Sequence, residues 1–326
     1  MAAAPRVLGE PPADVAASLK RLANALDREI PAKRPGGNLL IATWNIRAFG
    51  DLTEKWRTGA GDTPKRNLHD VRAIAEIVSR FDVVALQEVR GNIKALRHTL
   101  KALGPQWAFI LTDVTRGSAG NDERLAFVFD LGRVKPSGLA CELVVPDEQL
   151  RRGVGEDALR RQFARTPYAV SFQAAGSTFI LVTLHVLFGK KPRERVAELR
   201  AIAEWLAEWA AEVDEFNQNL MALGDFNIDR RGDPNYEAFA STGLRPPDEL
   251  DGLSRTIFDD PGKESFFDQI AWFAADGRPR LSLEYTHNAG RFEWTRHVLE
   301  RLRDVEKSWR ISDHYPLWAE FSLGAR

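Results

Sequence analysis

The sequence predicts one α/β domain over residues 38–326, in which two apolar-faced β-sheets pack together with helices on their outer sides. Two observations lead to this prediction. Short apolar runs of strand length recur along the chain, between segments whose apolar residues repeat at helical spacing. Several strand-like runs also follow one another with only short turns between them, which implies antiparallel pairing.

Composition and charge place few limits on the partners of the chain. Its 326 residues can bury a sizeable core, and the formal net charge of −1 argues neither for nor against an anionic partner. No apolar run approaches the roughly 18 residues that a membrane span needs, and the N-terminus has no signal-peptide core. Cys141 is the only cysteine, which excludes a disulfide framework and a cysteine metal site. We therefore expect a cytoplasmic protein without a membrane span, and no obligate protein partner is evident.

Residues 1–37 are predicted to form a helical extension and a linker. Asp14 can cap a helix whose apolar residues repeat at helical spacing. These apolar residues are Val15, Leu19, Leu22, Leu26 and Ile30. A segment rich in proline and glycine, residues 31–37, then ends the helix. The helix packs either on the main body or on a partner.

The remaining elements are expected in a mixed order. A strand over 39–43 leads through a polar loop to a helix over 71–78, and a strand over 82–86 leads to a helix over 93–103. Further strands are expected at 107–112, 125–130, 139–145, 168–174 and 177–184. A long helix at 196–213 precedes strands at 220–223, 267–273 and 317–321.

A buried strand over 220–223 ends at Gly224 and is followed at once by Asp225 and Asn227. Side chains two positions apart on an extended backbone point to the same face of a strand. Asp225 and Asn227 are therefore expected to project together where the strand meets solvent. A charge and an amide at such a place indicate a ligand site, although both residue types are also common in ordinary turns.

Four other strand-like runs carry polar side chains at comparable positions. Asn45 follows the run 39–43, Glu88 follows the run 82–86, and His185 follows the run 179–184. Asp313 and His314 directly precede the terminal run 315–321. Five such coincidences in one chain indicate a single site that distant parts of the sequence build together.

The residue types at these positions fit the hydrolysis of a phosphate ester. Carboxylate and amide oxygens are hard ligands that suit Mg²⁺ or Mn²⁺. Two separate histidines suit proton transfer near neutral pH, one removing a proton and one donating it. Asp268 and Asp113, each beside a strand-like run, are the candidates for orienting these histidines. A divalent cation with a histidine pair fits phosphoester hydrolysis better than acyl chemistry, and no G-x-S-x-G nucleophile motif is evident.

The ordered set of these motifs resembles the endonuclease/exonuclease/phosphatase superfamily. The set comprises Trp44-Asn45-Ile46, Gln87-Glu88, Leu184-His185, Gly224-Asp225-Phe226-Asn227, Phe267-Asp268-Gln269-Ile270 and Ser312-Asp313-His314. Each motif alone is weak, whereas the six in this order are specific, and they span nearly all of residues 38–326. The resemblance implies a four-layer α/β sandwich of two packed mixed sheets flanked by helices, and metal-dependent phosphoester hydrolysis in a catalytic domain over 38–326.

The same resemblance implies a role for each matching residue. Glu88 would be the principal metal ligand, with Asn45 and Asp313 nearby. Asp225 and Asn227 would bind or polarise the phosphate and the attacking water. His314, paired with Asp268, would be the general acid or base.

Within the superfamily, the chain is similar to the DNase I branch. The stretch Arg165-Thr166-Pro167-Tyr168, followed by Leu184-His185, carries this similarity. It implies that Arg165 contacts a phosphate. Asp113 matches a position where that branch has a glutamate paired with the second histidine, here His185, and aspartate is one methylene shorter. In the tetrapeptide Asn121-Asp122-Glu123-Arg124 we interpret Arg124 as structural.

Three functions are compatible with the sequence. The first is a divalent-metal nuclease, with DNA preferred over RNA as the substrate. The second is the same chemistry on a small or lipid phosphoester, similar to sphingomyelinases or inositol phosphatases. The third is a non-catalytic binding module, which the competent residues at every matched position disfavour. The basic runs 151–165 and 190–200 are expected to be solvated surface, with a phosphate-contact role open for the second run.

Overall fold

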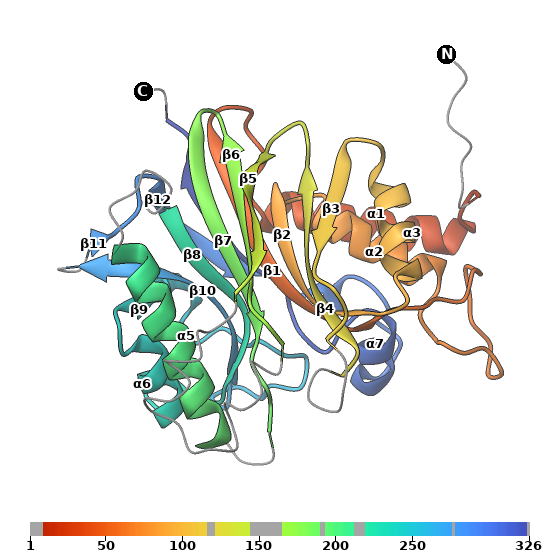
Figure 1. The fold of residues 1–326 in the computed structure, drawn as a ribbon. Coiled ribbons are helices and arrows are strands. Elements are labelled where there is room, and N and C mark those ends of the chain that lie inside the picture. The colour runs from red at the N-terminus through yellow and green to blue at the C-terminus, as the bar shows by residue number, and fades with distance from the viewer. Residues whose placement is uncertain are drawn as a thin grey trace.

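Two β-sheets lie face to face in the computed structural model, which describes residues 9–115, 121–143, 165–189, 193–211, 219–275 and 278–324 (Figure 1). The strand order in the first sheet is β12-β13-β1-β2-β4-β3. Its strands are β1 (Asn38–Phe49), β2 (Val83–Arg90), β3 (Trp107–Leu111), β4 (Glu123–Asp130), β12 (Glu284–Arg291) and β13 (Leu317–Ser322).

The second sheet has the order β11-β10-β8-β7-β6-β5, and β9 pairs with β10 beside this path. Its strands are β5 (Lys135–Glu142), β6 (Tyr168–Ala174), β7 (Ser177–His185), β8 (Leu220–Ile228), β9 (Leu244–Arg245), β10 (Phe266–Ala275) and β11 (Arg278–Pro279). Each sheet contains one parallel pair, β1 with β2 and β7 with β8, and the other described pairs are antiparallel. Both sheets are therefore mixed.

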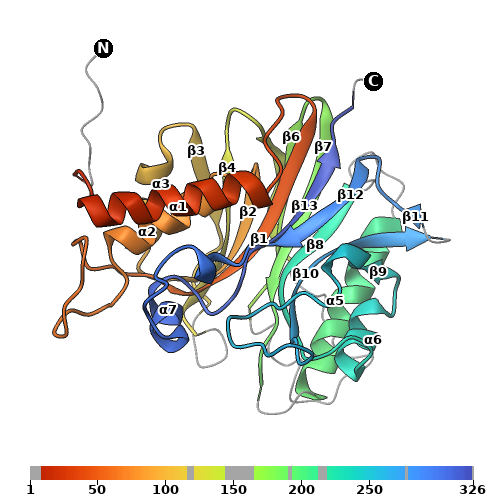
Figure 2. The ribbon, with the colours of Figure 1, turned by 180° about the vertical axis from the view of Figure 1, so that it is seen from behind.

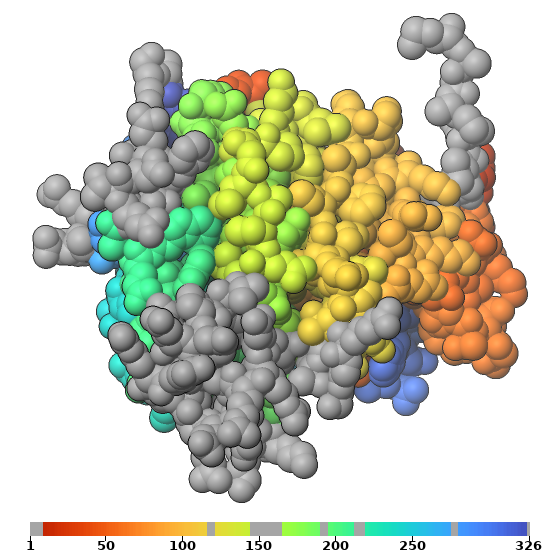
Figure 3. All heavy atoms as spheres, in the orientation of Figure 1, coloured from red at the N-terminus to blue at the C-terminus, as the bar shows by residue number. Residues whose placement is uncertain are grey.

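Helices cover the outer face of each sheet (Figure 2). On the first sheet lie α1 (Ala13–Glu29), α2 (Leu68–Val78) and α3 (Lys94–Leu103), and on the second lie α5 (Arg193–Ala211) and α6 (Pro234–Ala240). The space-filling view shows the yellow-green segment around β5 adjoining the yellow-orange segment around β3, so the two halves form a continuous body (Figure 3). None of the described helices is long and apolar enough to cross a membrane.

Alternate side chains of the strands enter different apolar layers. On β1, Leu40 and Trp44 belong to the layer under the helices, while Leu39 and Ile41 belong to the layer between the two sheets. A third layer, which includes Phe239, lies between the second sheet and α5 and α6. Because successive residues of a strand face opposite sides, one run of apolar residues serves two layers. The predicted four-layer α/β sandwich is confirmed.

Helix α1 packs on the main body of the protein. Leu22 and Leu26 have no exposed surface and belong to the same apolar layer as the outer face of β1. The prediction that Asp14 caps this helix is wrong. Pro12 occupies the N-cap position, and Asp14 lies in the first turn, where it pairs with Arg57.

The sequence did not predict β12 or the short helix α7 (Asp304–Arg310). Strand β12 is an edge strand that reads EYTHNAGR and lacks a regular alternation of apolar residues. In α7, Val305 and Trp309 are exposed, so the helix has no buried apolar stripe to recognise. Both elements depend on their place in the fold more than on their own sequence.

Candidate active site

The two sheets bring the predicted polar side chains together at one end of the molecule. Asp225 on β8 is in register with His185 on one neighbouring strand, β7, and with Asp268 on the other, β10. Asn45, near the end of β1 in the other sheet, donates from Nδ2 to Asp225 Oδ2 over 2.9 Å. This buried hydrogen bond joins the two sheets at the site.

Gly224 allows β7 and β8 to approach closely just before the site. Its φ is +143°, and a Cβ at this position would lie 2.1 Å from the carbonyl oxygen of Leu184. Any residue with a side chain would clash with that backbone. The glycine therefore fixes the spacing of His185 and Asp225, the residues that follow Leu184 and Gly224.

His314 and Asp268 form a buried imidazole–carboxylate pair. His314 Nδ1 lies 2.6 Å from Asp268 Oδ2, and Asp268 has no exposed surface. Burial lowers the pKa of His314, but the charges of Asp268, Asp225 and Asp313 outweigh burial and hold this pKa well above its ordinary value. The predicted contact between His314 and Asp268 is confirmed, and the imidazole favours its protonated form.

A second imidazole–carboxylate pair has a partner that the sequence did not predict. His185 Nδ1 lies 3.2 Å from Glu123 Oε2, and Arg165 Nε pairs with the same oxygen. These contacts are at ion-pairing distance without the angles of aligned hydrogen bonds. Burial raises the pKa of Glu123, but the contact with His185 and the charge of Arg165 outweigh burial and lower the pKa to about 2.

The predicted pairing of His185 with Asp113 is wrong. Asp113 is exposed, and its carboxylate accepts a hydrogen bond from the adjacent Val114 N–H. Asp113 follows β3, the edge strand of the first sheet, whereas Glu123 begins β4, one strand further in. An acid at the start of a buried strand that runs antiparallel to β2 is the signal that identifies Glu123.

Both imidazoles face the carboxylate of Asp225. The Nε2 atoms of His185 and His314 lie 3.7 Å and 4.0 Å from Asp225 Oδ2. The other oxygen, Oδ1, accepts a hydrogen bond of 2.9 Å from the backbone N–H of Asn227. Asn227 in turn donates from Nδ2 to the carbonyl of Val186 over 2.6 Å, so its amide is fixed to the segment that follows β7.

Glu88, Asn45 and Asp313 form a set of hard oxygen donors that fits a divalent cation. Burial is the largest cause that raises the pKa of Asp313, and the negative charge of Glu88 raises it further. Asn45 Oδ1 is buried and has no hydrogen-bond partner among the described residues. Arg47 Nη1, 3.1 Å from Asp313 Oδ2, places a positive charge beside this carboxylate. A buried amide oxygen without a partner suits a divalent cation, and Glu88 and Asp313 are close enough for their charges to interact.

Asp225, Asp268 and His314 also present oxygen and nitrogen atoms within 4.8 Å of one another. The 2.6 Å contact between His314 Nδ1 and Asp268 Oδ2 leaves no room for an ion between these two atoms. The opposite ring nitrogen, Nε2, faces Asp225 instead. We therefore interpret this group as proton-transfer machinery.

Two further arginines hold the backbone of site residues, and the sequence did not identify them. Arg195, only 2% exposed, donates from Nη1 to the carbonyl of Asn227 over 2.5 Å. Arg255, without exposed surface, donates from Nε to the carbonyl of Asp268 over 3.0 Å. The expectation that the run 190–200 is solvated surface is therefore wrong for Arg195. Lys190, Lys191 and most of the run 151–165 lie outside the described residues.

Arg165 is buried rather than presented to solvent. Besides its pair with Glu123, its Nη1 lies 3.5 Å from the carbonyl oxygen of His185. The guanidinium therefore supports the second imidazole–carboxylate pair. Its predicted contact with a phosphate stays a prediction.

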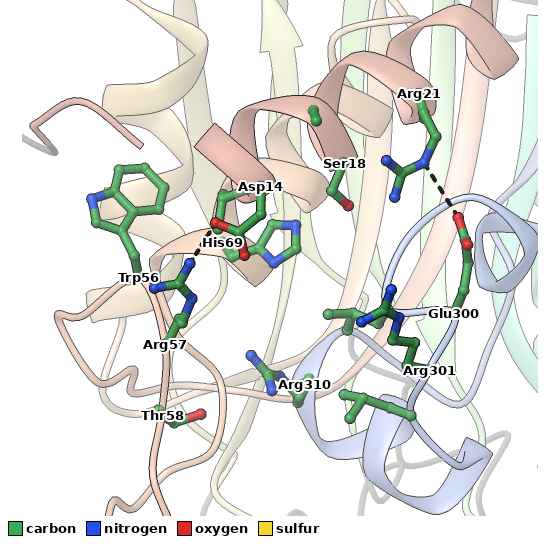
Figure 4. A pocket seen from close by; sticks show the side chains of 14 residues that line it. Asp14, Ser18, Arg21, Trp56, Arg57, Thr58, His69, Glu300, Arg301 and Arg310 are labelled. Carbon is green, nitrogen blue, oxygen red and sulfur yellow. Dashed lines mark hydrogen bonds and ion pairs between the residues drawn. The ribbon is translucent and has the colours of Figure 1, made fainter. Parts of the chain in front are cut away.

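A cavity of about 690 Å³ lies away from these side chains, between α1, the loop 56–58 and the segment 299–310 (Figure 4). Four of its charged side chains form two pairs: Arg57 pairs with Asp14, and Arg21 pairs with Glu300, 3.5 Å apart. None of the residues of the two imidazole–carboxylate pairs lines it. Neither geometry nor charge connects this cavity with the chemistry of the site.

Comparisons with known proteins show the family and agree with the fold. The sequence profile described as the Endonuclease/Exonuclease/phosphatase family matches residues 42–314. A deoxyribonuclease of Thioalkalivibrio sp. is 27% identical over 295 residues, which cover 87% of this chain and 71% of that protein. Deoxyribonuclease-1 of Bos taurus is 26% identical over 201 residues, which cover 60% of this chain and 62% of that protein. A mannosyl-6-phosphatase of Bacteroides thetaiotaomicron shares the fold with a TM-score of 0.55 at 19% identity, over 87% of this chain and 99% of that one.

Proposed function

The chain belongs to the Endonuclease/Exonuclease/phosphatase family, and we propose that it is a divalent-metal-dependent nuclease that hydrolyses phosphodiester bonds of DNA. One observation carries the proposal: two imidazole–carboxylate pairs converge on the carboxylate of Asp225 beside a set of hard oxygen donors. The names of the two deoxyribonuclease relatives support DNA as the substrate, with RNA as the second choice.

The two histidines divide the proton transfers between them. His314 favours its protonated form because three carboxylates surround it, so it donates a proton from Nε2 to the leaving oxygen. His185 accepts the proton of the attacking water at its own Nε2, and Glu123 stabilises the imidazolium that results. Asp225, between the two Nε2 atoms, orients the water, and Asn227 holds this carboxylate in place.

Glu88, Asn45 and Asp313 would hold the cation, which we propose to be Mg²⁺ or Mn²⁺ because oxygen ligands without cysteine or free imidazole suit these ions. When bound, the cation would supply positive charge for the oxygens of the phosphate. Arg47 contributes a fixed positive charge on the same side of Asp313.

The test compares supercoiled plasmid, single-stranded DNA, RNA and a generic small phosphodiester, with Mg²⁺ or Mn²⁺ and with chelator. We expect cleavage of DNA that chelator abolishes. Glu88→Gln keeps the shape of the side chain but removes its charge, so activity should fall and a higher metal concentration should partly restore it. Asp113→Asn, at an exposed carboxylate outside the site, is the matched control and should behave as the parent.

The outcomes separate the hypotheses. Full activity of Glu88→Gln at low Mg²⁺ would contradict the assignment of this ligand. Hydrolysis of the small phosphodiester without cleavage of any nucleic acid would favour a small or lipid phosphoester as the substrate. The cytoplasmic location stays a prediction, which fractionation of the native host would test.

A further inference from the structure

Large apolar side chains that are exposed to solvent gather around the proposed active site. Five such side chains occur in the described part of the chain: Leu131 (42% exposed), Phe188 (56%), Phe258 (50%), Val305 (55%) and Trp309 (52%). All except Leu131 belong to segments that contact the site residues directly or through one neighbour. Exposed apolar groups collected in one place mark an interaction surface more often than scattered ones do.

Trp309 is attached to the site through Arg47. The guanidinium carbon of Arg47 lies 3.9 Å from the centre of the Trp309 ring, at cation–π distance. Arg47 is itself fixed, because its Nη1 lies 3.1 Å from Asp313 Oδ2 and 3.0 Å from Ser308 Oγ. The indole ring is thus held in a defined orientation next to a proposed metal ligand, although half of it remains exposed. Val305, one helical turn earlier in α7, extends the apolar surface.

Two phenylalanines, Phe188 and Phe258, are connected to the site through neighbouring residues. Phe188 follows His185 by three residues, and its ring stands at 81° to that of Phe267, with 6.3 Å between the centroids. Phe267 in turn lies 6.2 Å from the His314 ring. Phe258 belongs to a loop whose preceding residue, Ile257, donates its N–H to the carbonyl of Asp313 over 2.8 Å. We call Phe188, Phe258 and Trp309 the aromatic rim.

The chemistry of the aromatic rim suits unpaired bases. Every base has a π-face that stacks on an aromatic side chain whatever its sequence, and a single strand leaves these faces accessible. In a duplex the neighbouring base pairs cover them. Acyl chains suit the rim less well, because burying Trp309 in them would also strip water from the charged Arg47 and Asp313 behind it.

We propose that the aromatic rim stacks against unpaired bases next to the scissile phosphate, so that the enzyme cleaves single-stranded nucleic acid in preference to duplex. The inference rests on the proposed nuclease function and specifies its substrate. Trp309 is the principal contact because Arg47 fixes its ring before any substrate binds, which reduces the entropy lost on stacking.

The test uses three substrates of equal length: oligothymidylate, its duplex with oligodeoxyadenylate, and an oligonucleotide built only of stable abasic residues. The parent should cleave oligothymidylate with the highest kcat/KM. Trp309→Ala should lower that value by about 5- to 150-fold, the range that corresponds to roughly 1–3 kcal/mol for one stacked base. It should leave the abasic oligonucleotide unaffected, because that substrate has no base to stack. Trp309→Phe should retain most of the activity on oligothymidylate.

Leu131→Ala is the matched control, since Leu131 is also an exposed apolar residue but follows the end of β4 opposite to Glu123. It should change none of the three rates. The thermal midpoint of Trp309→Ala should match that of the parent, because half of the ring is already in water.

Four results would overturn the proposal. An equal loss on the abasic oligonucleotide would make Trp309 a support for Arg47 and Asp313 instead of a contact for bases. If the parent cleaved duplex as fast as single strands, the proposed preference for single-stranded nucleic acid would be wrong, while the nuclease function would stand. A lipid contact would be identified if the parent sedimented with vesicles of phosphatidylcholine and phosphatidylserine and Trp309→Ala did not. In that case oligonucleotide cleavage by Trp309→Ala would be unchanged. No cleavage of any of the three substrates by the parent would contradict the nuclease function itself.

Discussion

The two imidazole–carboxylate pairs of the site have the same residue types but differ in how they are held. His314 Nδ1 lies 2.6 Å from Asp268 Oδ2, and Asp268 is fully buried. His185 shares Glu123 with Arg165, and its contact with the carboxylate is longer, 3.2 Å. The first carboxylate serves one histidine, whereas the second divides its charge between an imidazole and a guanidinium.

This difference has a structural origin and a consequence for proton transfer. Asp268 is in register with Asp225 on the neighbouring strand, so one sheet fixes both carboxylates that face His314. Glu123 reaches His185 from the opposite sheet, and Arg165 contacts the same carboxylate oxygen, while Asn121 donates to the other one. A dedicated carboxylate keeps a proton on His314, whereas His185 shares its carboxylate with the guanidinium of Arg165.

The largest effect is expected from the His314 pair. His314→Ala should lower kcat by about 10²–10⁴-fold, because this is the usual contribution of a general acid or base. Asp268→Asn should act in the same direction, and the double variant should be no worse than His314→Ala alone, because the pair works as a unit. Steady-state kinetics with metal in excess measures the three values. If the two losses in kcat add in the double variant, His314 and Asp268 act independently of each other.

A smaller loss is expected from the second pair. Glu123→Gln keeps the length of the side chain but removes the charge that stabilises the imidazolium of His185, so kcat should fall by about 10², the low end of acid–base contributions. Asp113→Asn is the control, because its carboxylate is exposed and makes no contact with His185. A loss in Asp113→Asn comparable to that in Glu123→Gln would restore the pairing that the sequence predicts.

The sequence predicted the partner of His314 but not the partner of His185, and the geometry of the two pairs explains why. Asp225, Asp268 and His314 each lie beside an apolar run, and local patterns of this kind reveal that a polar group sits at the end of a strand. Which of two acids meets His185 depends on strand order, because β4 lies inside β3 in the sheet. Nothing local to Asp113 or Glu123 encodes that order.

The same limit applies to the rest of the fold. The apolar runs predicted the strands of both sheets except β9, β11 and β12, because a buried strand must be apolar on at least one face. Strand β12 and helix α7 were missed because their stability comes from neighbours: β12 pairs with β13, and Arg310 of α7 pairs with the buried Asp70. The buried Arg195 and Arg255 were missed because their partners are backbone carbonyls, which every sequence contains.

Acid stability offers a sharper test of how Glu123 is held. Its pKa in the folded protein is about 2, below the ordinary value of 4.5, so the stability it contributes is present above pH 4.5 and is lost as the pH falls towards 2. Between pH 5 and pH 3 the free energy of unfolding should fall by about 2 kcal/mol more in the parent than in Glu123→Gln. Urea midpoints across this range measure the difference. Identical pH profiles would mean that Arg165 and His185 do not hold the carboxylate.

The smallest effect separates the two roles open to Arg165. If its guanidinium contacts a duplex phosphate, Arg165→Ala should reduce the slope of log K against log salt by about 0.9, which amounts to roughly 3- to 4-fold in affinity over a fourfold change in salt. If it serves only to hold Glu123, the slope should stay unchanged while kcat falls and Glu123→Gln adds no further loss. Binding to a labelled duplex at several salt concentrations, with Ca²⁺ in place of Mg²⁺ to suppress cleavage, measures the slope. A changed slope together with a non-additive loss in kcat would show that one guanidinium serves both the phosphate and the second pair, and the weaker hold on His185 would then depend on whether substrate is bound.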